Sequence, residues 1–468
     1  MTLADLSIAL PLLILAIGAI LTLIQGAITR NPAAGTILAT VAAIGAGLWA
    51  MKTPAAVSAP ALGLAAGGLA RLFTAFFAFM SAAVLILSGR YNAFRDIGGE
   101  EYPATILFAA FGMVAVASAT NLLILFLGLE AMTFGFYLLA AIDLGRPASS
   151  EAGLKYLLMG VLSAAFLAFG VALLYCAAGT FGLVEVARHT LGGALDPLAL
   201  AGWGCVLIGM LFKLSLVPAH LWTPDVYQAA PAPVVAFLSG GSKAASILML
   251  LLVWANATEL ASLRVPLFTL ALLTMVVGNF SALRQTDVRR LLAYSSIAQM
   301  GYVVVALIGY HGAGLQAAAF YAIAYALMSL AAFGAVGVLE QSGCGRTVDD
   351  YRGRGFTHPV AAGTLAVALF ALAGIPPSAG FTGKFLIFAS ALRAGEYALA
   401  VIGILTAAVS VYYYLRVVAA LYLHPAAGSE KESAGVAGTI VLLLSAILIV
   451  LLGVFPSSLL DFLKTQLP

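Results

Sequence analysis

Charged side chains lie inside stretches that are otherwise almost entirely apolar. Four of the seven lysines, Lys155, Lys213, Lys243 and Lys384, interrupt such stretches, and so does one acid, Glu130. The chain is 63% hydrophobic and only 9% charged, whereas an ordinary soluble domain has about 25% charged residues. A charge at the centre of a membrane helix costs roughly 2.5–3.5 kcal/mol. Such costly residues are expected to have a functional role. Lysine and glutamate side chains can both take up and release protons, so the five residues predict proton transfer.

Apolar stretches long enough to cross a membrane fill most of the chain. A spanning helix needs about 20 apolar residues, and the sequence predicts about fourteen such helices. We therefore expect an all-α membrane protein without a sizeable soluble domain. The first apolar stretch is preceded by Asp5 and by no basic residue, so we interpret it as a retained helix rather than a cleaved signal peptide.

The loop charges predict an orientation. Twelve Lys and Arg residues follow odd-numbered predicted helices, and six follow even-numbered helices or lie at the C-terminus; the four lysines in apolar stretches complete the total of 22. Because cytoplasmic loops carry an excess of Lys and Arg, the odd loops are predicted to be cytoplasmic. Both termini are then expected on the outer side of the membrane.

An internal repeat is visible in the apolar pattern. Leu211–Pro218 and Leu369–Pro376 share Leu, Phe, Leu and Pro at the same places, and Lys155–Gly160 is similar to Phe320–Tyr325. We predict three N-terminal helices in 1–100, one five-helix repeat in 101–256, a second in 257–423, and a loop with the last helix in 424–468. An odd number of helices per repeat inverts the second copy in the membrane, which is a common transporter design.

Both repeats contain a predicted break in a helix. Pro218 follows Lys213, and Pro376 and Pro377 precede Lys384. Proline removes a backbone donor and clashes with the preceding turn, and carbonyls freed in hydrocarbon must find partners among neighbouring helices, side chains or water. A broken helix beside each of two buried lysines therefore predicts local hydration.

The charged residues can be assigned roles by their positions. Glu130 and Lys213 are the expected ion pair, because a nearby ammonium favours the ionised carboxylate. Lys243 lies among small residues, and Lys384 follows the second break. A buried ammonium gives up its proton more readily than an exposed one, whereas arginine stays protonated. Further polar side chains could hydrate the helix that lacks a counterpart of Glu130: Tyr294, Ser295, Ser296 and Gln299.

Structural explanations stay open for several of these residues. Glu130 could simply lock two helices together, and the lysines could extend their ammonium groups towards a membrane interface. The second explanation is strongest for Lys155, which lies near Glu151. His220 follows the first break, where it could relay protons or cap freed carbonyls.

Cofactor-binding patterns are missing from the sequence. Cys176, Cys205 and Cys344 are isolated, and five scattered histidines show no metal-ligand spacing. Neither a Rossmann glycine motif nor a phosphate-binding loop occurs. We expect no cofactor, metal, disulfide or nucleic-acid partner for this chain.

Several segments together resemble the antiporter-like membrane subunits of respiratory complex I, over essentially the whole chain. The most specific are Phe212–Val234, Leu238–Lys243, Arg289–Tyr302 and Leu372–Lys384. Within this family, lysine at position 384, the length of the chain and the segment Asp349–Gly353 are similar to the N-type branch. One departure is Ala371, which stands where the first repeat has Lys213.

The resemblance implies a fold of fourteen transmembrane helices and a proton path. Glu130 and Lys213 would be the coupled pair, Lys243 the central relay and Lys384 the far relay. Lys155 and His220 match positions of supporting importance.

The resemblance also implies a setting. The chain would be a translocase subunit of an NADH-quinone oxidoreductase in the bacterial inner membrane, with both termini on the periplasmic side. Its partners would be other membrane and peripheral subunits, which would hold FMN and iron–sulfur clusters and bind NADH and quinone. Alternatives are a subunit of a multi-subunit cation/proton antiporter, a related membrane hydrogenase or dehydrogenase, and a structural membrane arm with vestigial charges.

Overall fold

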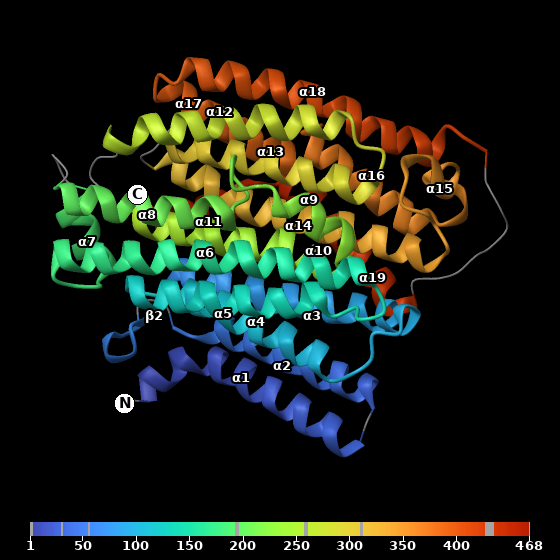
Figure 1. Ribbon diagram of the computed structural model, residues 1–468, viewed down its shortest axis with the longest axis horizontal. Coiled ribbons are helices and arrows are strands. Elements are labelled where there is room, and N and C mark those ends of the chain that lie inside the picture. Colours follow the sequence, from blue (N-terminus) through green and yellow to red (C-terminus); the bar gives the residue numbers. More distant parts are fainter. Residues whose placement is uncertain are drawn as a thin grey trace. The chain divides into compact units, whose positions relative to one another are not determined.

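The computed structural model describes residues 3–29, 31–54, 57–191, 196–256, 261–308, 312–425 and 435–467, and helices dominate these ranges (Figure 1). Residue contacts divide the chain into two compact units. The first unit is Met1–Lys213 with Leu248–Leu260, and the second is Leu214–Ile247 with Ala261–Pro468. One helix, α11 (Lys243–Trp254), begins in the second unit and continues into the first.

Long helices and one small hairpin form the first unit. Asn31 caps the start of α2 by accepting hydrogen bonds from the backbone of Ala33 and Ala34, and Asn121 caps α5 through Ile124. Such caps satisfy the donors that the first turn of a helix leaves free. The elements are α1 (Leu3–Thr29), α2 (Pro32–Lys52), β1 (Val57–Ala59), η1 (Pro60–Leu62), β2 (Leu64–Ala66), α3 (Gly68–Arg95), α4 (Glu101–Ser118), α5 (Leu122–Ala141), α6 (Pro147–Ala178), α7 (Leu183–Thr190) and α8 (Pro197–Lys213).

Glycines let α4 and α5 approach each other closely. A Cβ atom added to Gly112 on α4 would lie 2.3 Å from the backbone nitrogen of Met132 on α5. Likewise, a Cβ atom added to Gly128 on α5 would lie 2.9 Å from the carbonyl oxygen of Gly112. Since helices in lipid associate through close packing of small residues, these two glycines fix the position of the helix that carries Glu130.

Gly112→Ala is expected to lower the thermal midpoint of the protein in mild detergent. The added methyl group meets backbone atoms, which cannot rotate away, and overpacking of this kind costs about 1–3 kcal/mol. The matched control is Gly204→Ala on α8, because a Cβ atom there meets nothing within 4 Å. Equal thermal midpoints for Gly112→Ala and Gly204→Ala would show that the close contact between α4 and α5 does not stabilise the protein.

The second unit is organised around two buried helices, α13 and α14. Within their most apolar windows, 89% of α13 and 94% of α14 residues are buried. α14 packs against α10, α13, α16, α17 and α19. The elements are α9 (Trp222–Ala229), α10 (Ala232–Phe237), the π-helical turn η2 (Leu238–Ser242), α12 (Ala261–Leu283), α13 (Val288–Ile308), α14 (Ala313–Gln341), η3 (Val348–Tyr351), α15 (Arg354–Thr357), α16 (Pro359–Ala373), α17 (Ala379–Arg393), α18 (Tyr397–Tyr422), α19 (Gly435–Val454) and α20 (Ser457–Gln466).

The described helices have the length and composition of membrane spans. Twelve of them are long and apolar enough to cross a membrane. Two further apolar helices, α8 and α16, are shorter and end at Lys213 and Ala373. The prediction of an all-α membrane protein is confirmed, with a two-stranded hairpin of three-residue strands as a small addition.

Candidate functional site

Glu130 and Lys213 form an ion pair in the first unit. Lys213 is the last residue of α8, and its Nζ lies 2.9 Å from Glu130 Oε1 on α5. The lysine side chain is 1% exposed and the glutamate side chain is 22% exposed. Breaking such a pair leaves an uncompensated charge in an apolar environment, so the contact ties the end of α8 to α5. The predicted pair is thus in contact.

Thr133 completes the site around the ammonium of Lys213. Lys213 Nζ donates a hydrogen bond to Thr133 Oγ1 over 2.8 Å, and that hydroxyl donates to the carbonyl oxygen of Leu129 over 2.6 Å. Thr133 was not among the residues predicted from the sequence. The available signal was its spacing, because residues three apart on a helix lie on one face, and Thr133 is three residues after Glu130.

The chain leaves the helical conformation directly after Lys213. Residues 214–221 separate α8 from α9, and His220 lies in this segment with 9% of its surface exposed. Thr223 Oγ1 donates to Ser215 Oγ over 2.7 Å, and the backbone nitrogen of Val217 donates to Thr274 Oγ1 over 3.0 Å. Hydroxyl groups thus supply hydrogen bonds in a segment where helical ones are interrupted.

Lys243 lies in the second unit, at the end of the π-helical turn η2. Its surface is 1% exposed, and its Nζ donates to Ser296 Oγ on α13 over 2.5 Å. Tyr325 on α14 donates to the same Ser296 oxygen over 2.6 Å. The ammonium also lies 5.8 Å from the centre of the Tyr227 ring. The Ser296 hydroxyl and the face of the Tyr227 ring therefore stabilise this ammonium. The π-helical turn that precedes Lys243 is of a kind that is frequent at functional sites.

Lys384 is bound by the end of the preceding helix. Its surface is 5% exposed, and its Nζ donates to the carbonyl oxygens of Leu372 over 2.6 Å and Ala373 over 3.3 Å. These are the last carbonyls of α16, where the helix dipole is negative. The Tyr302 ring centre lies 5.1 Å from the ammonium. The second predicted break thus supplies the acceptors for the lysine that follows it.

Lys155 has a different environment from the other three lysines. It lies on α6, its side chain is 47% exposed, and its Nζ is 2.8 Å from Glu151 Oε1. Exposed pairs at this i, i+4 spacing contribute little to stability. The geometry matches the structural explanation that the sequence left open for this residue.

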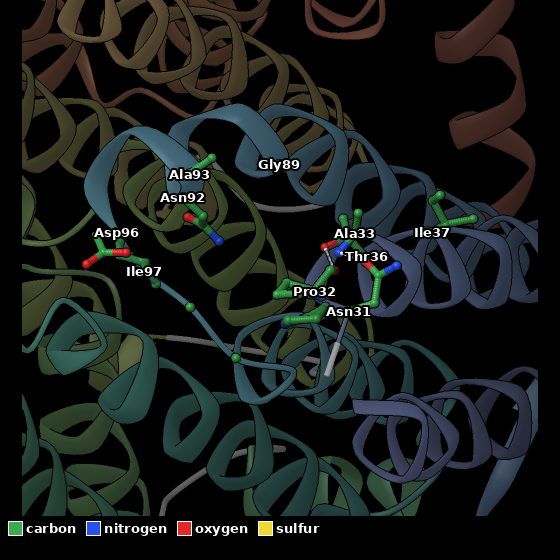
Figure 2. Close-up of a pocket in the computed structure, with 13 residues that line it drawn as sticks. Asn31, Pro32, Ala33, Thr36, Ile37, Gly89, Asn92, Ala93, Asp96 and Ile97 are labelled. Carbon is green, nitrogen blue, oxygen red and sulfur yellow. Dashed lines mark hydrogen bonds between the residues drawn. The ribbon is translucent and has the colours of Figure 1, made fainter. Parts of the chain in front are cut away.

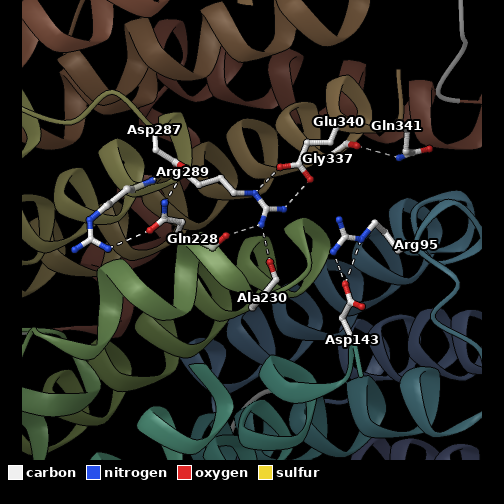
Figure 3. A network of polar contacts seen from close by, with 10 residues as sticks. Arg95, Asp143, Gln228, Ala230, Asp287, Arg289, Gly337, Glu340 and Gln341 are labelled. Atoms are coloured by element: carbon white, nitrogen blue, oxygen red, sulfur yellow. Dashed lines mark hydrogen bonds and ion pairs between the residues drawn. The ribbon is translucent and has the colours of Figure 1, made fainter. Parts of the chain in front are cut away.

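Two buried ion pairs were not anticipated from the sequence (Figure 3). In the second unit, Arg289 on α13 pairs with Glu340 on α14, with 2.7 Å between Nε and Oε1. Arg289 also donates to the carbonyl oxygens of Gln228 over 3.2 Å and Ala230 over 2.7 Å. The guanidinium therefore ties the end of α9 to α13 and α14.

The second of these pairs belongs to the first unit. Arg95, the last residue of α3, pairs with Asp143 in the loop after α5 (Figure 3). Their side chains are 8% and 5% exposed, respectively. This contact joins two elements at one end of the first unit.

A cavity of about 560 Å³ lies in the first unit (Figure 2). Asn31 at the start of α2 and Asn92 and Asp96 at the end of α3 contribute to its wall. The lining drawn in Figure 2 includes none of the predicted site residues. Among the described residues, no group of three or more His, Cys, Asp and Glu side chains could hold a metal ion.

Helices of membrane-spanning length, with ammonium and carboxylate groups held between them, define a class of protein. The chain is a polytopic membrane protein whose interior carries an ion pair and two further buried lysines. A family model described as NADH:quinone oxidoreductase/Mrp antiporter, TM, matches residues 119–410. The chain belongs to this family.

Relatives and solved structures agree with this membership. NADH-quinone oxidoreductase subunit N from Geotalea uraniireducens is 55% identical over 100% of both chains. A chain of respiratory complex I from Thermus thermophilus, solved with bound aureothin, has a TM-score of 0.82 at 33% identity and covers 96% of this chain and 98% of its own. A chain of an archaeal membrane-bound sulfane sulfur reductase has a TM-score of 0.88 at 26% identity, covering 100% and 97%.

Proposed function

We propose that this chain is the N-type proton-translocating subunit of a bacterial NADH-quinone oxidoreductase. Its 55% identical relative carries that name over its full length. The observation that carries the proposal is the ion pair between the buried Lys213 and the partly exposed Glu130. In this role the chain is part of an enzyme, a translocase, but performs no redox chemistry itself.

The proposed architecture has fourteen spans. Twelve long helices and the two shorter helices α8 and α16 together give this number among the described residues. Two inverted five-helix repeats would occupy 101–256 and 257–423, between the N-terminal helices in 1–100 and the last helix in 424–468. The non-helical segments after α8 and α16 support one broken helix in each repeat.

The proposed mechanism is a stepwise transfer of protons between side chains. A signal from the partner subunits changes the separation of Glu130 and Lys213, which alters how tightly Lys213 holds its proton. The proton then passes through Lys243 towards Lys384, and His220 and Lys155 have supporting roles. The burial of Lys213, Lys243 and Lys384 supports their role in the transfer, whereas the exposure of Lys155 supports at most a peripheral role.

The proposed setting is the bacterial inner membrane, with both termini on the periplasmic side and protons leaving the cytoplasm. Electron transfer would take place in partner subunits that hold FMN and iron–sulfur clusters and bind NADH and quinone. Purification in mild detergent tests the assembly. A peripheral arm with flavin and iron–sulfur clusters should copurify, whereas copurification with antiporter subunits alone, or with a hydrogenase, would replace the proposal by one of its alternatives.

Lys213→Ala and Glu130→Ala are both expected to reduce proton pumping by the assembled enzyme. Each substitution removes one partner of the ion pair. The distance between the two charges can then no longer control how tightly the remaining partner holds its proton. The measurement is the number of protons pumped per NADH oxidised in liposomes. Asp461→Ala is the matched control, because that carboxylate belongs to an exposed pair on α20. Full pumping by both variants would contradict the mechanism.

A further inference from the structure

Two hydrogen-bonded clusters, one around each buried lysine of the second unit, meet at α13 and α14. The Lys243 cluster consists of Lys243, Ser296 and Tyr325, in which the lysine and the tyrosine both donate to the serine oxygen. Ser296 is 1% exposed and Tyr325 is 2% exposed. These contacts form an enclosed hydrogen-bonded group around the central lysine.

The Lys384 cluster consists of Lys384, the carbonyl group of Leu372, Gln299 and Tyr321. Lys384 Nζ and Gln299 Nε2 both donate to the Leu372 oxygen, over 2.6 Å and 3.0 Å. Tyr321 donates its hydroxyl hydrogen to Gln299 Oε1. Gln299 is 1% exposed and Tyr321 is fully buried. Gln299 Nε2 also donates to the Tyr414 hydroxyl over 3.1 Å. The glutamine side chain thus stands between two tyrosine hydroxyls and the acceptor of Lys384.

The clusters are neighbours along the same two helices. Ser296 and Gln299 are three residues apart on α13, and Tyr325 and Tyr321 are four residues apart on α14, so each pair lies on one helix face. The rings of Tyr321 and Tyr325 are stacked, with centres 6.5 Å apart. The two clusters therefore lie one helical turn apart along both helices, and the stacked tyrosine rings are the contact between them.

The chemistry of Gln299 differs from that of the hydroxyl groups around it. A hydroxyl can accept one proton and release another, whereas a carboxamide accepts only at its oxygen and donates only from its nitrogen. A proton taken up at Oε1 and released from Nε2 would leave an imidic acid, which must rearrange before the next transfer. The Leu372 carbonyl accepts from both sides and has no proton to give. The link is therefore closed in the observed arrangement.

We propose that Gln299 is a gating residue that controls proton transfer between Lys243 and Lys384. When its side chain turns away, a water molecule can bridge Tyr321 and Lys384 and complete the path. The step starts with Lys384 as an amine and with the Tyr325 hydroxyl rotated from Ser296 towards Tyr321, so that Ser296 can pass its own proton to Tyr325. The Lys243 ammonium then becomes an amine, the Lys384 amine becomes an ammonium, and each hydroxyl on the way gains and loses one proton. This inference rests on the proposed function, because it concerns the same proton path.

The test uses the complete enzyme in liposomes with two substitutions of similar size. Gln299→Glu keeps the shape but introduces a group that accepts and releases protons, so an imposed pH gradient should decay faster without NADH, and fewer protons should be pumped per NADH. Gln299→Leu removes all three hydrogen bonds of the side chain, to Leu372, Tyr414 and Tyr321, so pumping should be lost while the decay stays as in the wild type. Gln341→Leu, on a half-buried glutamine of α14, is the control.

Two results would overturn the gate. Wild-type pumping and decay in both Gln299 variants would show that the side chain controls nothing, and equally fast decay in both would show general disruption of the helix packing. Lys384→Ala separates these failures from a failure of the proposed function. If Lys384→Ala stops pumping while the Gln299 variants behave as wild type, the gate alone is wrong; if Lys384→Ala pumps fully, the proposed proton path is wrong.

Discussion

Lys243→Arg is expected to stop proton pumping although it preserves the positive charge. The guanidinium group of arginine stays protonated at physiological pH, so it can neither release nor take up the transferred proton. Loss of a positioned proton-transfer group typically costs about 10²–10⁴-fold in rate. Lys243 donates to Ser296 and faces the Tyr227 ring, and both groups stabilise a cation. Arginine can therefore occupy the site as a cation, but it cannot be deprotonated there. Protons pumped per NADH oxidised measure the effect.

The control for Lys243→Arg is Lys464→Arg, which makes the same change in an exposed pair on α20. It should pump as the wild type does. Arginine is larger than lysine, so Lys243→Gln is a second variant, with similar length and no charge. If either variant at position 243 pumps at the wild-type rate, Lys243 is not a relay.

Glu340→Ala is expected to lower the stability of the protein by about 3–5 kcal/mol, the usual effect of removing one partner of a buried pair. Arg289 is 1% exposed and would remain charged without its carboxylate. The measurement is the thermal midpoint in mild detergent. The double variant Arg289→Met with Glu340→Leu should recover much of the loss, because replacing both partners by apolar groups is often neutral or stabilising.

An exposed pair offers the matched control for Glu340→Ala. Asp349 and Arg352 lie 2.7 Å apart, with side chains 75% and 54% exposed. Since exposed pairs contribute about 0–1 kcal/mol, Asp349→Ala should leave the midpoint nearly unchanged. An unchanged midpoint in Glu340→Ala would show that the buried pair does not hold α13 and α14 together.

The sequence predicted the ion pair of Glu130 and Lys213 because an unshared charge in an apolar stretch requires a partner. Hydropathy indicates which residues are costly to bury, and these two are costly. It gives no such signal for hydroxyl groups, which occur throughout membrane helices. Thr133 was therefore missed as a contact of Lys213, and Tyr325 as a contact of Ser296. Ser296 was recognised only as a source of hydration.

Charges near helix ends set a second limit on prediction. Arg289 is the second residue of α13 and Glu340 is the penultimate residue of α14. From the sequence alone, both read as ordinary charges at the ends of membrane helices. Their burial depends on how α9, α13 and α14 pack, and that packing follows from contacts distant in sequence. Helix positions were accordingly predictable, whereas the environment of each helix end was not.

The contacts between α13 and α14 have a mechanical consequence. Along α13 the order is Ser296 and then Gln299, whereas along α14 their partners follow in the reverse order, Tyr321 and then Tyr325. A displacement of one helix along the other would therefore change both hydrogen bonds in a single movement. A movement of either helix would therefore change the hydrogen bonds near Lys243 and those near Lys384 at the same time.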